Sequence, residues 1–230
     1  MNKTFILLFF ICIILSAAFF LPEANYESSN ILAHNVIIRR VEEKPDAMAF
    51  ACNVDWGSEW IPEMIRIFEE EDIRITFFPT GNWAKKNPKL LRQIYIYNHE
   101  IGNHGYSHKL AKQLSKEAER KEILDTEKVI LDLVNIKTSL YGPPSGEYDE
   151  DTLSLCKELN YDLILWSIDT IDWKEGSTAD IITQRVLDKP LEGSIVLMHP
   201  KEETVKALPG IIQEIKEKDI KIVSIGELIS

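Results

Sequence analysis

The chain has 230 residues, of which 45% are hydrophobic and 27% charged, a composition typical of a folded globular domain. Its 26 Lys and Arg residues stand against 37 Asp and Glu residues, which gives a formal net charge of -11. Nucleic-acid backbones attract basic surfaces, so this acidity argues against nucleic-acid binding. The composition also excludes a disordered scaffold and a collagen-like rod.

The N-terminus carries an uncharged apolar run, residues 5–21, which follows a single Lys3. Its length lies between that of a signal-peptide core and the roughly 20 residues of a bilayer span. Residues 1–21 are therefore interpreted as a signal peptide or a membrane anchor. Either fate exports the rest of the chain, to the extracellular or cell-wall face, with membrane contact only through this segment.

The polar stretch 22–34 predicts a linker, and the folded domain should occupy residues 35–230. Along this domain strand-like runs are separated by segments with helical periodicity. The predicted strands are 47–53, 73–79, 100–104, 138–142, 162–168, 194–199 and 221–224. Strands that alternate with helices predict parallel βαβ units, and hence a barrel-like or doubly wound α/β domain.

The pattern also predicts which side chains are buried. A helix over 115–135, capped by Ser115, should bury Leu124, Ile130, Leu131 and Val134. Cys52 and Cys156 are expected to be small buried hydrophobic residues without a disulfide framework, and Trp166 to pack in the core. His34 and His99 are expected at the surface.

Polar and aromatic residues follow the apolar runs of five predicted strands. In parallel α/β folds the chemistry gathers at the carboxyl ends of the strands, so these side chains should surround one site. They are Asn53, Asp55, Trp56, His104, His108, Ser145, Asp169, Asp172, Trp173 and His199.

His104 and His108 are four residues apart, which lets both imidazoles face one point. Such a pair also arises by chance in exposed loops. Asp55, at the mouth of a different strand, favours the functional reading because it could complete a three-ligand metal site with an open water position. Two histidines and a carboxylate are a ligand set for hydrolytic metal chemistry.

His199 ends the apolar run of a predicted strand, where it is either a core histidine or a general acid or base. Its reference pKa allows proton transfer near neutral pH, which favours the second role. Asp169 and Asp172 could orient a cation or a histidine, and Trp173 could supply a flat wall for a sugar ring.

The ordered motifs CNVDWG, HGYSH, GPPSGEY, DTIDW and LMHP resemble those of the NodB-type polysaccharide deacetylases, also called carbohydrate esterase family 4. The likeness runs from about residue 36 to 230 and is greatest to the sporulation-associated branch. It implies a distorted (β/α)7 barrel, the NodB homology domain. It also implies removal of N-acetyl groups from cell-wall or chitin-like polysaccharide with a divalent metal, zinc first and cobalt as an alternative.

The resemblance assigns a role to each matched residue. His104 and His108 match the metal-binding histidines, and Asp55 would join them as a third ligand or serve as the base. His199 matches the general acid, and Asp172 matches the carboxylate that organises the base and its arginine partner. Three further residues match positions that contact the glycan substrate: Ser145, Trp173 and Leu197.

Two positions depart from the family pattern. Aligned on the preceding strand, Asn53 replaces the base aspartate, and an amide cannot accept a proton at physiological pH. Aligned on Gly57 instead, the base position falls at Asp55. The first register is preferred, with Asp55 as the surviving carboxylate. Gly142 replaces the arginine that pairs with the base, a coherent double loss because that arginine would otherwise face a neutral amide.

Two hypotheses follow from these matches and departures. In the first, the chain is a metal-dependent polysaccharide deacetylase in which Asp55 serves as ligand or base and His199 as acid. In the second, it is a catalytically impaired relative that keeps the groove and binds cell-wall glycan. The retained site residues favour the first hypothesis, and Asn53 and Gly142 favour the second.

Overall fold

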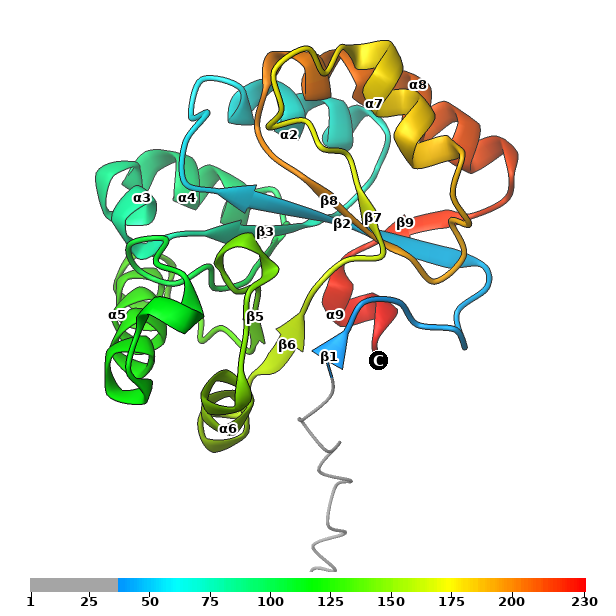
Figure 1. Ribbon diagram of the computed structural model, residues 1–230. Coiled ribbons are helices and arrows are strands. Elements are labelled where there is room, and N and C mark those ends of the chain that lie inside the picture. Colours follow the sequence, from blue (N-terminus) through cyan, green and yellow to red (C-terminus); the bar gives the residue numbers. More distant parts are fainter. Residues whose placement is uncertain (1–36) are drawn as a thin grey trace, which may run out of the picture. The chain divides into compact units, whose positions relative to one another are not determined.

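The computed structural model describes residues 37–230. The predicted leader 1–21, the predicted linker 22–34 and His34 lie outside the described residues. Strands and helices alternate through the described part, as the sequence predicts, and the helices surround the strands (Figure 1). No helix within residues 37–230 combines the length and the apolar character needed to cross a bilayer.

The described strands form two sheets in which every ladder is parallel. The larger sheet has the order β4 (Glu100–Ile101), β3 (Thr76–Pro79), β2 (Ala47–Val54), β8 (Ile195–Met198) and β7 (Ile168–Asp169), and β9 (Lys221–Val223) also pairs with β2. The smaller sheet has the order β1 (Ile37–Ile38), β6 (Asp162–Ile164) and β5 (Leu140–Tyr141). Of these strands, only β1 was not predicted from the sequence.

The two sheets join into a distorted barrel. Asn103, just after β4, bridges in parallel to Tyr141 of β5, and its backbone N–H donates to the carbonyl of Leu140 at 2.9 Å. On the other side the segment 162–169 gives β6 to the smaller sheet and β7 to the larger one. The single strand predicted over 162–168 is thus divided in two, and this division lets one segment serve both sheets.

Side chains along β2 alternate by size between the two faces of the sheet, as the pleat requires. Met48, Phe50 and Cys52 enter the large hydrophobic cluster formed with the helices. Ala47, Ala49 and Ala51 point the other way, into an inner cluster that contains Phe78, Leu140, Ile164 and Ile195. Small side chains on the inner face leave room for the Phe78 ring inside a narrow barrel.

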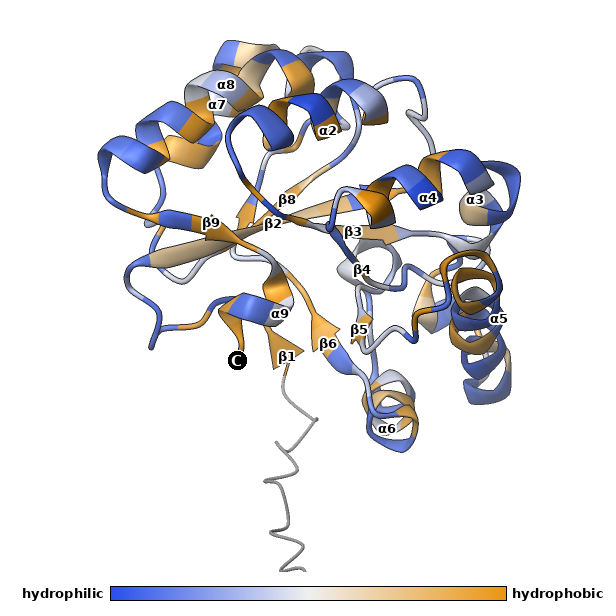
Figure 2. Cartoon of the chain, turned by 180° about the vertical axis from the view of Figure 1, so that it is seen from behind, coloured by the Kyte–Doolittle hydropathy of each residue, from blue (hydrophilic) through white to orange (hydrophobic). Residues whose placement is uncertain are grey.

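The helices cover the outer faces of the strands, with α2, α7 and α8 over the larger sheet (Figure 1). Hydrophobic residues occupy the strands and the inner faces of the helices, and hydrophilic residues the outer faces (Figure 2). The helices are α2 (Ile61–Glu70), α3 (Gly81–Lys86), α4 (Pro88–Ile96), α5 (Lys116–Val134), α6 (Glu150–Leu159), α7 (Ala179–Leu187), α8 (Glu202–Glu217) and α9 (Ile225–Leu228).

Helix α5 begins as predicted, because the Ser115 hydroxyl accepts a hydrogen bond from the Ala118 N–H at 3.3 Å. Its buried face differs in part from the prediction. Ile130 and Val134 are buried, whereas Leu124 and Leu131 are 38% and 43% exposed. Two polar residues, Glu119 and Thr126, are buried on this helix instead. The prediction, which rested on hydrophobicity alone, had placed the two leucines on the buried face.

His99 is buried, with 3% of its surface exposed, so its predicted surface position is wrong. Its ring makes T-shaped contacts with the rings of Phe68 and Phe77. Its Nδ1 accepts a hydrogen bond from the backbone N–H of Ile75. Burial, followed by the charge of Arg74, lowers the pKa of His99 from 6.5 to about 4. The ring is therefore neutral at physiological pH and serves the core.

Cys52 and Cys156 are buried and unpaired, as the sequence analysis expects. Burial raises the pKa of both thiols, for Cys156 to about 12. A thiol in this state is a poor nucleophile and metal ligand. Both cysteines therefore act as packing residues.

Candidate functional site

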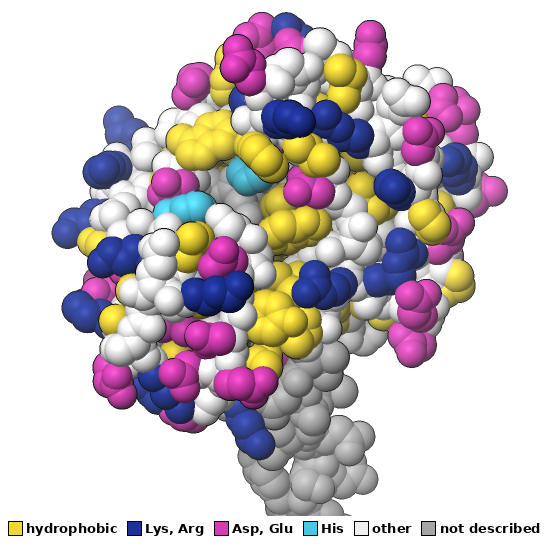
Figure 3. All heavy atoms as spheres, viewed as in Figure 1, with side chains coloured by type: hydrophobic (Ala, Val, Ile, Leu, Met, Phe, Trp, Pro, Cys, Tyr) yellow, Lys and Arg dark blue, Asp and Glu magenta, His cyan; other side chains and the backbone are white. Residues whose placement is uncertain are grey.

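Residues from the ends of several strands meet in one hollow of about 340 Å³. Figure 3 looks toward it and shows two histidine side chains beside the opening, with hydrophobic side chains around them. The lining residues are Asn53, Asp55, Trp56, His104, His108, Ser145, Trp166, Asp169, Trp173, Leu197 and His199. The hollow thus gathers all the predicted site residues except Asp172. The roles that the resemblance implies for these residues stay predictions.

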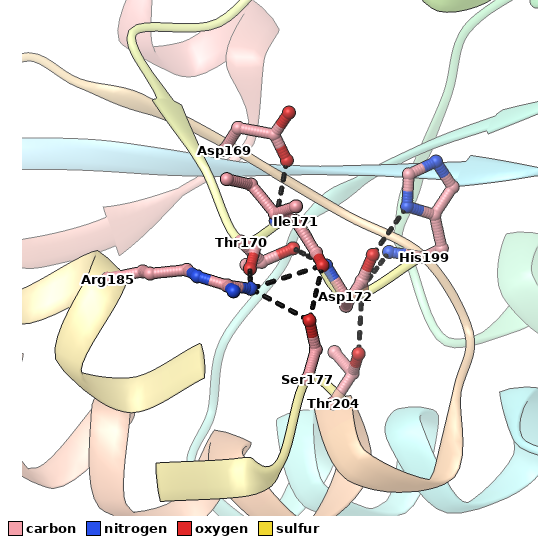
Figure 4. A network of polar contacts seen from close by, with 8 residues as sticks. All are labelled: Asp169, Thr170, Ile171, Asp172, Ser177, Arg185, His199 and Thr204. Carbon is pink, nitrogen blue, oxygen red and sulfur yellow. Dashed lines mark hydrogen bonds and ion pairs between the residues drawn. The ribbon is translucent and has the colours of Figure 1, made fainter. Parts of the chain in front are cut away.

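Asp172 lies behind the wall of the hollow, 1% exposed, and holds His199 in place. Its Oδ1 lies 2.7 Å from His199 Nδ1, and its Oδ2 accepts from the His199 backbone N–H and from the Thr204 hydroxyl, each at 2.7 Å (Figure 4). Burial alone would raise the pKa of Asp172, but these hydrogen bonds outweigh it and lower the pKa. An ionised carboxylate only accepts, so His199 Nδ1 is the donor and Nε2 is the nitrogen available for proton exchange.

The turn that carries Asp172 is strained and is supported from behind by helix α7. Ile171 has φ of 51°, a left-handed conformation that is costly for a β-branched residue. Arg185 of α7 donates through one guanidinium nitrogen to the carbonyls of Thr170 and Ile171, at 2.8 and 3.2 Å, and to the Ser177 hydroxyl at 2.9 Å (Figure 4). Sequence reasoning missed Arg185, because an arginine on an amphipathic helix gives no signal beyond an exposed surface.

His104 and His108 come together at the hollow. Their ring centroids are 5.0 Å apart in an edge-to-face arrangement. His104 is 1% exposed, and its Nδ1 lies 2.6 Å from the carbonyl oxygen of Gly142, so Nδ1 is the donor. Burial, followed by the charge of His108, lowers the pKa of His104 to about 3. The ring is thus neutral and its Nε2 carries a lone pair.

The loop between these histidines is fixed by Glu122 of α5. Its Oε2 accepts from the backbone N–H of Ser107 at 2.6 Å, and its Oε1 from the Ser107 hydroxyl at 2.7 Å. His108 ends this loop with φ of 56°. Glu122 is a second supporting residue that the sequence analysis did not identify.

Asp55 follows β2 and is exposed, and its Oδ1 accepts a hydrogen bond from the Thr80 hydroxyl at 2.7 Å. It lines the hollow together with His104 and His108. Within residues 37–230, however, no three His, Cys, Asp or Glu side chains are grouped closely enough to hold a metal ion. A catalytic zinc site takes three protein ligands, so the predicted ligand set does not fit this centre as arranged.

The two departures from the family pattern lie in the wall of this site. Asn53 lies on the same inner face of β2 as Ala49 and Ala51. Its side chain lines the hollow, and the residue is 7% exposed. A side chain at Gly142 would begin 3.1 Å from the Phe78 ring, which would have to shift by a few tenths of an ångström. The site therefore has an amide and a bare backbone where the resemblance implies a carboxylate and an arginine.

Aromatic residues form much of the wall. The Trp56 ring stacks on the His199 ring with centroids 5.5 Å apart and an interplanar angle of 11°, and Lys201 Nζ lies 5.8 Å from the Trp56 centroid. Trp173 is 55% exposed and also lines the hollow. Trp166 packs partly against the inner cluster and also lines the hollow, so the expectation of plain core packing was incomplete.

Three comparisons place these observations among known proteins. Residues 41–164 match the family model described as polysaccharide deacetylase. The uncharacterized protein YlxY of Bacillus subtilis is 32% identical over 90% of this chain and 63% of its own length. A peptidoglycan-N-acetylglucosamine deacetylase of Bacillus cereus is 33% identical over 74% of this chain and 63% of its own length. The chain thus spans slightly less than two thirds of these two relatives.

A solved structure shares the fold and much of the sequence. It is a pseudoenzyme of carbohydrate esterase family 4 from Bacillus anthracis, with a TM-score of 0.82 and 34% identity, covering 85% of this chain and 69% of that chain. A mutant of that pseudoenzyme is described as having restored enzymatic activity. The comparison therefore includes a relative that has the fold without the activity.

Proposed function

Since the chain belongs to the polysaccharide deacetylase family, we propose that it binds cell-wall glycan in the hollow at its strand ends and is catalytically impaired. The observation that carries the proposal is the pair Asn53 and Gly142, which stand where the resemblance implies the base and its arginine. Export by residues 1–21 would bring the domain to such a glycan.

The His199–Asp172 hydrogen bond supports the acid half of the implied reaction. A protonated His199 could give its Nε2 proton to a departing amine, with Asp172 stabilising the imidazolium through Nδ1. Hydrolysis also needs a group that takes a proton from the attacking water. Asn53 cannot do so, and loss of a general base slows such reactions by roughly 10² to 10⁴. Support also comes from the Bacillus anthracis relative named as a pseudoenzyme.

One observation favours the first hypothesis, a hydrolase that removes N-acetyl groups from cell-wall or chitin-like polysaccharide. Asp55 lines the same hollow as His104, His108 and His199, so a carboxylate is present in the site. In that case Asp55 would accept the proton that Asn53 cannot. Asp55 is exposed, however, and its Oδ1 is already engaged by the Thr80 hydroxyl, which makes this the second candidate.

The test measures three quantities on the same preparation: bound zinc or cobalt, glycan binding, and acetate release from N-acetylglucosamine oligomers and peptidoglycan. We expect binding by the wild type without acetate release. Asp55→Ala and His104→Ala should weaken glycan binding, and acetate release should stay at the background level in both variants. Acetate release by the wild type that disappears in both variants would instead establish the hydrolase, and absence of glycan binding would refute the proposal.

A further inference from the structure

Two histidines of the hollow can present hydrogen-bond acceptors to it. His104 donates through Nδ1 to the Gly142 carbonyl, and this leaves Nε2 as the acceptor of its neutral ring. His199 donates through Nδ1 to Asp172, and when neutral it too presents Nε2 as an acceptor. Among residues 37–230 no hydrogen bond uses either Nε2, so both lone pairs are open to a donor on a bound ligand.

Two carboxylates add negative charge to the same hollow. Asp55 and Asp169 both line it, and none of the described lining residues is a lysine or an arginine. Asp169 accepts the Ile171 N–H through Oδ1 at 2.7 Å, and Figure 4 shows its other oxygen turned away from this bond. Burial raises the pKa of Asp169, so an incoming positive charge would relieve a cost already present in the fold. Lys201 does not line the hollow, and its Nζ lies over the Trp56 ring, 5.8 Å from the centroid.

These features distinguish the two forms in which an amino sugar occurs in glycans. An acetamido group is neutral, and its carbonyl oxygen needs a donor or a cation. A free amino group is protonated, carries positive charge and offers three N–H donors to surrounding acceptors. The hollow supplies acceptors and negative charge, and Gly142 leaves it without the arginine that could face a carbonyl.

We infer that the hollow recognises de-N-acetylated amino-sugar residues, through their ammonium groups, in preference to the acetylated form. The inference rests on the proposed function, because it specifies which glycan the same hollow binds. The ammonium group would lie between Asp55 and Asp169, with the sugar ring against the exposed face of Trp173. The protein would thus bind the product of deacetylation rather than its substrate.

The test compares calorimetric titrations with glucosamine and N-acetylglucosamine oligomers of matched length, with EDTA present and at a pH that keeps the amino groups protonated. An oligolysine of matched charge measures nonspecific attraction to this acidic chain. We expect the wild type to bind the glucosamine oligomer about tenfold more tightly, as one charge-assisted hydrogen bond provides. Added salt should reduce that preference.

Asp169→Asn and Asp55→Asn test the origin of the preference. Asparagine keeps the side-chain oxygen that accepts from Ile171 or Thr80, so each variant removes charge and little else. Each should lower affinity for the glucosamine oligomer several-fold and affinity for the acetylated oligomer much less. The matched control is Asp219→Asn, an exposed residue with φ of 57° that asparagine adopts readily, and it should change neither affinity.

The outcomes separate the inference from the proposed function. Equal or tighter binding of the acetylated oligomer overturns the inference and leaves glycan binding intact. A glucosamine preference that survives in both variants, or that oligolysine reproduces, also overturns it, because the charge of the hollow would not be the cause. Absence of binding to either oligomer refutes the proposed function itself.

Discussion

Asn53 has the position, burial and direction of a side chain that meets a bound ligand, but not the chemistry of a base. It follows Ala47, Ala49 and Ala51 on the inner face of β2, so the backbone already directs its side chain into the hollow. A carboxylate there would require only the replacement of one amide nitrogen by oxygen. The change in chemistry between a binding site and a hydrolytic one is therefore small at this residue.

The double variant Asn53→Asp with Gly142→Arg should gain acetate-releasing activity, because it adds a base carboxylate together with a cation that lowers its pKa. Asn53→Asp alone should gain less, since its new charge lacks a partner. Activity is measured as acetate release from N-acetylglucosamine oligomers, with and without added divalent metal.

The new arginine must displace the Phe78 ring by a few tenths of an ångström. A version with Phe78→Leu gives the side chain room and controls for misfolding. If both folded versions release no acetate, further residues of the site lack the required chemistry.

His99 should make the protein sensitive to acid. Its pKa is about 4 in the folded protein and near 6.5 when unfolded, so the unfolded chain binds an extra proton between these values. The free energy of unfolding should therefore fall as the pH is lowered from 6.5 to 4, by up to about 3 kcal/mol from this residue.

Urea unfolding at a series of pH values measures the effect. In His99→Leu the decline over this pH range should be smaller than in the wild type, although His104, whose pKa is also lowered, still contributes. A decline equal to that of the wild type would show that His99 is not its source.

At the level of elements, helix α7 does more than cover the sheet. Arg185 reaches back to the strained turn at Ile171 and thereby holds Asp172 against His199 (Figure 4). The position of His199 thus depends on an arginine of a helix that contributes no residue to the lining of the hollow. An interaction of this kind links the stability of α7 to the geometry of the hollow.

Arg185→Gln should cost about 1 to 3 kcal/mol in the free energy of unfolding, because several buried oxygen acceptors lose a charged donor. It should also shift the NMR signals of the His199 imidazole, which a purely stabilising residue would leave in place. Arg185→Lys should restore part of both properties. Arg92→Gln, at an exposed position of α4, is the matched control, and unchanged His199 signals in Arg185→Gln would contradict the positioning role.

The sequence predicted the existence and order of the strands and helices better than it predicted which side of a helix is buried. The strand-end rule brought His104, His108, Asp169 and His199 to one hollow, because apolar runs mark the parallel strands clearly. The helical pattern was wrong for Leu124 and Leu131, since hydrophobicity could not reveal that Glu119 is buried on that helix, where it accepts a hydrogen bond from Thr152. Arg185 and Glu122 were missed because most of their partners are backbone groups, which leave no pattern in the sequence.

For the whole molecule, the described domain contains its own core and its own site. The large and the inner hydrophobic clusters are built from residues 37–230, and so is the hollow. A protein made from residues 35–230 should therefore unfold at the same temperature as the full chain and bind glycan with the same affinity. Calorimetry on both forms checks this expectation, and a lower unfolding temperature of the shorter form would show that residues 1–34 stabilise the domain.

The central strand β2 has a consequence for how the chain reaches its folded state. Ala47–Ala49 pair with Lys221–Val223, and Ala49–Cys52 pair with Ile195–Met198, so the strand at the middle of the larger sheet is completed by segments about 150 to 170 residues later in the chain. Pairing over such sequence separations forms slowly, because a long loop must be closed, at a cost in chain entropy, before the strand contacts can stabilise the structure. A nascent chain that has exposed β2 alone still lacks β8 and β9, so the larger sheet can be completed only after the C-terminal part of the domain has been made.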